Sequence, residues 1–286
     1  MNRKYQIAGH LFGVSGEKVC AAVDCIEGFR PFRVEVGEPL FVFREGRLQD
    51  VPQEREVQYT FDYEDVTGRF IRTEDGFRLS LRPEAEDAFE LWCRRDEPVV
   101  WLCGNWSLRL YRFALWVGYG LMTLSAATLA IHSSCIIYKD KAVLFLGESG
   151  TGKSTHTRLW REHIPGAVLL NDDSPVIRVE DGKVWAYGSA WSGKTPCYKN
   201  ERYELQGCVR LSQAPSNRIR KLTVLQAYGA LHPSCAPEFA YDGTLYDEVS
   251  RTLGQILSVV PCYHLACLPD GDAARLSCLT LFPEDR

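Results

Sequence analysis

The stretch Gly147-Glu-Ser-Gly-Thr-Gly-Lys153-Ser154 decides how this sequence folds. It follows the apolar run Ala142-Val-Leu-Phe-Leu146 and precedes a segment that suits a helix as far as Trp160. A strand, a glycine-rich turn and a helix in that order form a phosphate-binding loop, because the glycines let backbone N–H groups turn toward one anion. Lys153 adds a cation for the β- and γ-phosphates, and Ser154 offers its hydroxyl to Mg²⁺. The sequence therefore predicts an α/β domain with a nucleotide site.

Two adjacent acids follow this loop at the end of the next predicted strand. Ala167-Val-Leu-Leu170 is typical of a buried strand, and Asn171-Asp172-Asp173 ends it where a parallel strand would face the loop. Alternation along a strand sends the two carboxylates in different directions, so one can hold Mg²⁺ while the other accepts a proton from an attacking hydroxyl. The sequence does not decide between them, and we assign Asp173 to the metal and Asp172 to the base. A turn or a helix cap is the alternative role for these acids.

A histidine reaches the same place if two neighbouring strands form a hairpin. Tyr138 and Ala142 should pair across the short link Lys139-Asp-Lys141. His132 then lies opposite Glu148, or one residue further along. Either register brings its imidazole beside the phosphates, where it can sense or neutralise the transferred group. The alternative is a structural histidine at the start of a strand.

A polar loop later in the chain offers one more cation. Ala190-Trp-Ser-Gly-Lys194-Thr-Pro196 can close over a nucleotide and bring Lys194 to the γ-phosphate, although a solvated turn has the same composition. Arg210, Asn217 and Arg218 are further candidates. The expected catalytic residues are Asp172, His132 and Lys153, and the expected metal ligands are Ser154 and Asp173. The expected nucleotide-binding residues are Gly147, Glu148, Ser149, Gly150, Thr151, Gly152, Lys153, Ser154, Thr155 and Lys194.

The first part of the chain has the period-two pattern of strands. Phe77, Leu79 and Leu81 alternate with polar residues, and short β-rich runs recur at residues 32–36, 40–43, 57–61 and 99–103. This pattern predicts a β-rich N-terminal domain over residues 1–111 with an antiparallel sheet. A segment near residues 84–95 suits a short helix that interrupts the sheet. No chemical motif indicates what this domain does.

A long apolar stretch separates the two parts. The nineteen residues from Phe113 to Ile131 carry no charge, which meets the length of a membrane span. Polar residues within the stretch and the lack of a basic flanking loop favour a buried helix instead. We therefore expect a protein without a membrane span, in which a buried helix over 112–131 begins a second domain, 112–286.

Composition and charge narrow the expected partners and compartment. The 286 residues carry 33 basic and 37 acidic side chains, a net charge of −4, without a dense basic run, so nucleic acid is not expected as a partner. The 11 cysteines show neither a C-x-x-C pair nor zinc-ligand spacing, which fits the reduced thiols of a cytosolic protein. The N-terminus lacks the apolar core of a signal peptide. A cytoplasmic protein is expected, and the sequence leaves open whether it forms a homo-oligomer.

Taken together, His132, the loop Gly147 to Ser154 and Asn171-Asp172-Asp173 resemble the catalytic domain of the HPr kinase/phosphorylase family. Cys267-Leu-Pro-Asp270 also looks like the C-terminal end of that family, so the resemblance covers roughly residues 130–275. The family shares its fold with ATP-dependent phosphoenolpyruvate carboxykinase. The resemblance therefore implies an α/β, mixed-sheet P-loop domain, with ATP and Mg²⁺ as cofactors.

The resemblance indicates the fold more closely than it indicates the acceptor of the phosphoryl group. Thr155 stands where the bifunctional enzymes usually have Glu, and their glycine-rich signature for the protein substrate is not recognisable after residue 190. We expect a kinase that transfers the γ-phosphoryl group of ATP to a Ser or Thr hydroxyl of a protein, a peptide or a small molecule. An ATP-binding adaptor or switch with slow or no turnover is one alternative. A carboxykinase-like enzyme is another, although that activity would need a much longer chain.

Overall fold

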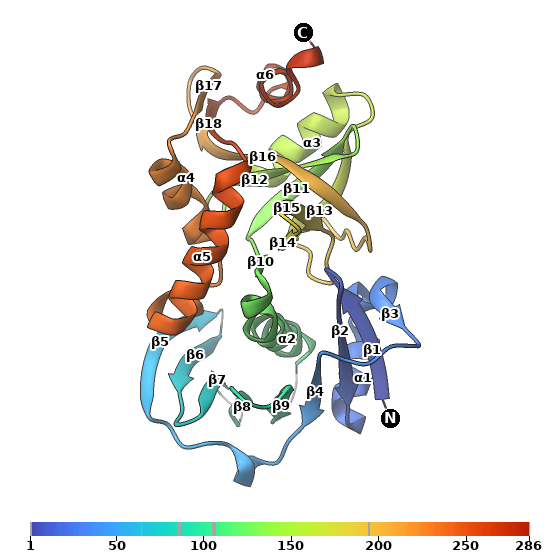
Figure 1. Ribbon diagram of the computed structural model, residues 1–286, viewed down its shortest axis with the longest axis vertical. Coiled ribbons are helices and arrows are strands. Elements are labelled where there is room, and N and C mark those ends of the chain that lie inside the picture. The colour runs from blue at the N-terminus through green and yellow to red at the C-terminus, as the bar shows by residue number, and fades with distance from the viewer. Residues whose placement is uncertain (1, 64, 85–86, 105–106, 194, 286) are drawn as a thin grey trace. The chain divides into compact units, whose positions relative to one another are not determined.

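A computed structural model describes residues 2–63, 65–84, 87–104, 107–193 and 195–285 of the chain. Lys194, which the sequence suggests as a nucleotide ligand, lies outside the described residues. The protein is a mixed α/β protein with two sheets, and each sheet contains both parallel and antiparallel strand pairs. Figure 1 shows the arrangement of its strands and helices.

The chain divides into two compact units. The first unit is Met1–Ser125 together with Glu238–Tyr246, and the second is Ala126–Pro237 together with Asp247–Arg286. The division expected from the sequence, 1–111 and 112–286, therefore differs from the structure in two ways. The boundary lies after Ser125, and a later segment of the chain also belongs to the first unit.

One mixed sheet makes up most of the first unit. It contains β1 (Asn2–Ile7), β2 (His10–Ser15), β3 (Arg33–Val34), β4 (Phe41–Glu45), β5 (Glu56–Tyr63), β6 (Val66–Arg72), β7 (Gly76–Pro83), β8 (Phe89–Arg94) and β9 (Val99–Cys103), in the order β3-β1-β2-β4-β9-β8-β7-β6-β5. Because β4 is parallel to β2 and to β9, the prediction of an antiparallel sheet is wrong at these pairs. The crossover that parallel neighbours need is supplied between β2 and β4 by α1 (Glu17–Cys25) and the short helix η1 (Glu27–Phe32).

The segment near residues 84–95 contains strand β8 rather than the expected short helix. Phe89 to Cys93 are all buried, and β8 pairs with β7 on one side and β9 on the other. A short, mostly apolar segment is compatible both with a buried helix and with a strand covered on both faces, so the neighbouring strands decide the outcome. Residues 85 and 86 lie outside the described part of the chain.

The apolar stretch forms α2 (Leu108–Thr123), so the expected helix over 112–131 has the wrong ends. The helix starts earlier because the hydroxyl of Ser107 accepts a hydrogen bond from the backbone N–H of Leu110 at 3.3 Å. After the short helix η3 (Leu124–Ala126), Ala127 has a φ of +49°, which is incompatible with a continuing helix.

Helix α2 packs against the first sheet, which curves around it in Figure 1. The ring centroid of Tyr119 lies 5.9 Å from that of Phe12, and the Tyr119 hydroxyl donates to the carbonyl of Ile7 at 3.0 Å. A Cβ at Gly118 would lie 2.7 Å from the Phe43 ring, so helix and sheet approach closely at this point. Among the described residues, no helix is both long and apolar enough to span a membrane.

The second half of the chain forms the other mixed sheet. Its strands are β10 (Thr128–Ala130), β11 (Ser133–Tyr138), β12 (Lys141–Leu146), β13 (Val168–Asp173), β14 (Val176–Glu180), β15 (Lys183–Tyr187), β16 (Arg202–Gln213), β17 (Arg218–Lys221) and β18 (Cys262–Cys267). The helices of this half are α3 (Lys153–His163), α4 (Val224–Leu231), α5 (Gly243–Val259) and α6 (Gly271–Leu281), with short 3-10 turns at His232–Ser234, Pro237–Tyr241 and Pro283–Asp285.

The order of the strands brings the C-terminal ends of β12 and β13 to the same edge of this sheet. The main path is β10-β14-β15-β16-β12-β11-β13, and β18 pairs with both β16 and β17. Strand β11 is antiparallel to both β12 and β13, so β12 and β13 run in the same direction. The loop that follows β12 and the acids that end β13 therefore lie at the same edge.

The hairpin of β11 and β12 forms in a register one residue away from the expected one. Tyr138 pairs with Lys141 rather than with Ala142. Lys139 and Asp140 have φ values of +48° and +56°, which make a tight two-residue turn whose twist matches that of the strands. The prediction of a three-residue link, with His132 opposite Glu148, is therefore wrong.

Helices α3 and α6 pack side by side against one face of this sheet, as Figure 1 shows. Trp160 of α3 is fully buried, and its indole N–H donates to the hydroxyl of Ser277 on α6 at 2.9 Å. Phe145 lies beneath the helix, with its ring centroid 5.6 Å from that of Trp160. This packing fixes the N-terminal end of α3 at the carboxyl end of β12.

Candidate functional site

The loop between β12 and α3 has the backbone conformation that its glycines suggest. Gly150 and Gly152 have φ values of +84° and +101°, and a Cβ at either position would meet no atom within 4 Å. These two residues are therefore required for their backbone angles and not for lack of space. Gly147 also has a positive φ, +151°, and a Cβ there would overlap the side chain of Thr151. The backbone conformation of the loop therefore favours glycine at positions 147, 150 and 152.

Lys153 begins α3 and turns its ammonium group back over the loop. Its Nζ donates to the carbonyl of Gly147 at 2.7 Å and to that of Glu148 at 3.3 Å. Burial lowers the pKa of Lys153, while the negative charges of Asp173 and Asp172 oppose that shift. The cation is therefore half-buried among carbonyl and carboxylate oxygens.

His132 connects this lysine to Asp173. The Nε2 atom of His132 lies 3.1 Å from Lys153 Nζ, and its Nδ1 atom lies 3.1 Å from Asp173 Oδ1. An ammonium group can only donate, so Nε2 accepts and Nδ1–H donates to the carboxylate. The backbone N–H of His132 also donates to the carbonyl of Ser234 at 2.6 Å, which fixes the start of the strand. Lys153, His132 and Asp173 thus form one continuous chain of polar contacts.

Asp173 adopts a backbone conformation that is rare for a residue with a side chain. Its φ is +132°, and it forms an isolated β-bridge with Ser192. Strained conformations of this kind cluster at functional sites, where the surrounding structure maintains them. The side chain of Asp173 is 36% exposed, so its carboxylate is open to solvent on one side.

Asp172 has a different set of neighbours. Its carboxylate accepts hydrogen bonds from the Ser154 hydroxyl at 3.1 Å, from the Ser134 hydroxyl and from the backbone N–H of Thr195 at 3.3 Å. The residue is only 3% exposed. Ser154 therefore contacts Asp172, whereas the sequence paired it with Asp173 as a metal ligand.

Asn171 holds the loop that passes over the two acids. Its side-chain amide donates to the carbonyl of Trp191 at 2.9 Å and to the hydroxyl of Ser189 at 3.3 Å. Its amide oxygen accepts from the backbone N–H of Ser174 at 2.9 Å. The residues from Ser189 to Gly193 are therefore held against the end of β13, and the backbone N–H of Gly193 donates to the carbonyl of Asp172.

The remaining predicted residues lie around the loop with fewer contacts. Glu148, Ser149 and Ser154 are exposed, and Thr155 is half-buried in the first turn of α3. Arg210 on β16 lies 4.0 Å from Glu148, and the Gln213 amide contacts the carbonyl of Gly150 at 3.4 Å. Lys194 lies outside the described residues.

Ser134, Ser189 and Ser192 were missed by reasoning from the sequence. Ser134 pairs with Asp172 across β11 and β13, and this pairing brings its hydroxyl to the carboxylate. The signal that could have found it is the register of two strands that are far apart in the sequence. No local motif marks a serine in such a position.

The donor groups suit a magnesium nucleotide. Mg²⁺ is usually held by one or two protein oxygen ligands together with phosphates and water, and Ser154 and Asp172 supply such oxygens beside the loop. Within the described residues, no group of three or more His, Cys, Asp or Glu side chains could hold a metal by itself. The two protein oxygens of Ser154 and Asp172 fit a metal whose other ligands would be phosphates and water.

Comparison with known proteins finds a distant structural likeness. No protein-family model matches the chain, and no curated protein matches its sequence. Among solved structures, the chain is similar to the Hpr(Ser) kinase/phosphatase from Coxiella burnetii, with a TM-score of 0.31 and 12% sequence identity. The match covers 55% of this chain and 95% of the other.

Proposed function

We propose that this protein is an ATP-dependent phosphotransferase that moves the γ-phosphoryl group to a Ser or Thr hydroxyl of a protein, a peptide or a small molecule. The observation that carries the proposal is the chain of contacts from Lys153 through His132 to Asp173, beside the loop. A module that only binds a nucleotide needs the loop and its lysine, but it needs neither the histidine nor the exposed carboxylate.

In this proposal the loop and Lys153 bind the phosphates of ATP, and Ser154 and Asp172 hold Mg²⁺. The bound metal neutralises charge on the phosphates and makes the γ-phosphoryl group easier to transfer. The half-buried position of Lys153 strengthens its attraction for phosphate, because water screens its charge less than that of an exposed lysine. A cytoplasmic location, where ATP and Mg²⁺ are abundant, belongs to the same proposal.

Asp173 is the base in this proposal, which reverses the assignment made from the sequence. Its exposed carboxylate accepts the proton of the acceptor hydroxyl while the oxygen attacks the γ-phosphorus and the bond to ADP breaks. His132 donates to the same carboxylate through Nδ1–H and orients it. Asp172 is nearly inaccessible and already accepts three kinds of donor, which suits a fixed metal ligand better than a proton acceptor.

The two acids give the sharpest test of these roles. Asp172→Asn and Asp173→Asn should each lower the rate of γ-phosphate loss from ATP by about 10² or more, the usual scale for losing a metal ligand or a general base. The Asp172 variant should also need more Mg²⁺ for its half-maximal rate, whereas the Asp173 variant should keep the metal dependence of the wild type. Rates measured across a range of Mg²⁺ concentrations separate the two effects.

Asp181→Asn is the matched control, because Asp181 is an exposed turn residue with a φ of +52°, a conformation that Asn tolerates. Its rate should equal that of the wild type. Near wild-type rates in both site variants would refute the kinase proposal and favour an ATP-binding adaptor. A raised Mg²⁺ requirement in the Asp173 variant alone would restore the assignment made from the sequence.

A further inference from the structure

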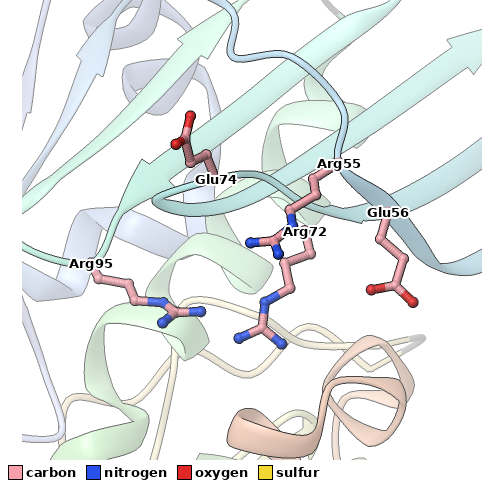
Figure 2. Close-up of a pocket in the computed structure, with 5 residues that line it drawn as sticks. All are labelled: Arg55, Glu56, Arg72, Glu74 and Arg95. Carbon is pink, nitrogen blue, oxygen red and sulfur yellow. The ribbon is translucent and has the colours of Figure 1, made fainter.

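A basic hollow lies on the first unit, among the ends of its β-strands. It has a volume of about 300 Å³ and is lined by Arg55, Glu56, Arg72, Glu74 and Arg95. Figure 2 shows the guanidinium groups of Arg55, Arg72 and Arg95 turned toward the same space, whereas the carboxylates of Glu56 and Glu74 point away from it. Three cations therefore face one space, and neither Glu56 nor Glu74 places its carboxylate between them.

Arg72, at the end of β6, is paired with a buried acid. Its Nη1 lies 2.8 Å from Oδ2 of Asp242, whose side chain is fully buried. The other carboxylate oxygen of Asp242 accepts from the backbone N–H groups of Thr244 and Leu245, so this acid is itself fixed. The backbone of Arg55 is tied to the same strand, because its N–H donates to the carbonyl of Arg72 at 3.0 Å. The backbones of Arg55 and Arg72 are thus joined by a hydrogen bond where β5 begins and β6 ends.

The charges in the hollow are not balanced. Arg72 is paired with Asp242, but neither Arg55 nor Arg95 has a carboxylate partner within the ranges that the structure describes. The guanidinium carbon of Arg95 lies 5.9 Å from the ring centroid of Phe77, a contact that positions the cation without neutralising it. Because the carboxylates of Glu56 and Glu74 point away, the guanidinium groups of Arg55 and Arg95 face the hollow without a carboxylate between them, and a bound anion would relieve their mutual repulsion.

We propose that this hollow binds a phosphate monoester, with Arg55, Arg72 and Arg95 donating to its oxygens. The planar guanidinium fork matches the spacing of phosphate oxygens, and three such groups can surround one phosphate. A phosphate monoester carries about −1.5 to −2 charges at neutral pH, which suits a hollow that three guanidinium groups face. A phosphorylated Ser or Thr of a peptide and a small phosphorylated molecule share this chemistry. The proposal does not depend on the proposed function, because none of these residues belongs to the loop after β12.

Titration calorimetry at low ionic strength tests the proposal with three probes: inorganic phosphate, a peptide with one phosphoserine, and the same peptide without the phosphate. Arg55→Gln combined with Arg95→Gln should weaken binding of the phosphopeptide by about tenfold or more, because two charged donors are lost. Glu74→Gln should strengthen it by about twofold to threefold, because an acid leaves the rim. Arg72 is left unchanged, since its loss would strand the buried Asp242.

Two controls separate the hollow from other anion sites. Arg82→Gln removes an exposed arginine of β7 that does not line the hollow, and it should leave the affinity unchanged. Lys153→Ala disables the loop after β12 and should also leave phosphopeptide binding intact. If the wild type binds inorganic phosphate and the double variant does not, the site is supported. If the phosphopeptide then fails to bind the wild type, the ligand is a small phosphorylated molecule. The proposal is overturned if the double variant binds as tightly as the wild type, if Lys153→Ala alone abolishes binding, or if both peptides bind equally.

Discussion

Glu238 is a carboxyl group buried without a partner for one of its oxygens. The residue is 2% exposed, and its Oε2 has no hydrogen-bond partner among the described residues. Burial raises the pKa of Glu238 to about 7, because desolvation penalises the charged form. In the folded protein the carboxyl group therefore keeps its proton at pH values where an exposed glutamate has lost it.

The pKa shift of Glu238 makes stability depend on pH. The folded state binds the proton more tightly than the unfolded state, so the free energy of unfolding should fall as pH rises from 4.5 to about 7. Glu238→Gln keeps the shape of the side chain but removes its charge. It should therefore flatten this slope and raise the free energy of unfolding at pH 7.5 by about 1–3 kcal/mol. Urea unfolding at pH 5 and at pH 7.5 measures both. The exposed Glu27→Gln should leave the slope as it is, and an unchanged slope in Glu238→Gln would contradict the prediction.

The hydroxyl of Ser277 makes a polar contact between helices α3 and α6. Ser277 of α6 accepts from the indole N–H of Trp160 at 2.9 Å, and it lies 3.1 Å from Nε2 of His156, both on α3. Burial lowers the pKa of His156 to about 4, so the imidazole is neutral above that pH and can share a hydrogen bond with the serine. The helix that begins with Lys153 is therefore anchored at its middle by a polar contact inside an apolar core.

Ser277→Ala should break this anchor. It leaves the Trp160 N–H buried without an acceptor, which costs about 1–3 kcal/mol of unfolding free energy. Ser258→Ala is the control, because Ser258 is exposed and its hydroxyl donates to the carbonyl of Gln255 on its own helix at 2.7 Å. Urea unfolding compares the two variants. Equal losses of stability would mean that the Ser277 contact contributes nothing specific.

Local elements could be predicted from the sequence where a motif determines them. The strand before Gly147 and the helix after Gly152 form as expected. The parallel pairs of β4 were missed, because periodicity shows that a strand exists but not which strand lies next to it. The hairpin register was missed by one residue, because the two-residue turn at Lys139 and Asp140 uses left-handed residues other than glycine.

In the candidate site, too, the sequence could not predict contacts between residues that lie far apart in the chain. The motif is enough to select Lys153 and Ser154, and the end of a strand is enough to select Asp172 and Asp173. Which acid contacts Ser154 depends on the pairing of β11 with β13, and local sequence carries no information about it. His132 lies beside Lys153 even though the register used to place it was wrong, because the end of β11 still meets the loop.

At the scale of the whole molecule, the candidate nucleotide site lies within the second unit and the basic hollow within the first. Binding at one site should therefore protect backbone amides of its own unit. Saturating MgATP should slow hydrogen exchange in α3 and β12, by a factor set by the affinity, and leave β5 to β8 unchanged. Mass spectrometry of exchanged peptides provides the measurement. Lys153→Ala should remove the protection, and equal protection of both units would show that the binding site is not confined to the second.

The measurement that tests the central claim most directly is transfer of label from γ-labelled ATP, in the presence of Mg²⁺, to acceptors in an extract of the source cells. The wild type should place acid-stable label on serine or threonine or on a small hydroxyl compound, since it aligns acceptor, base and phosphate. Lys153→Ala and Asp173→Asn should transfer at most about a hundredth as much, whereas Lys183→Ala, an exposed change on β15, should match the wild type. Wild-type protein that binds MgATP yet transfers no more label than Asp173→Asn would contradict the account.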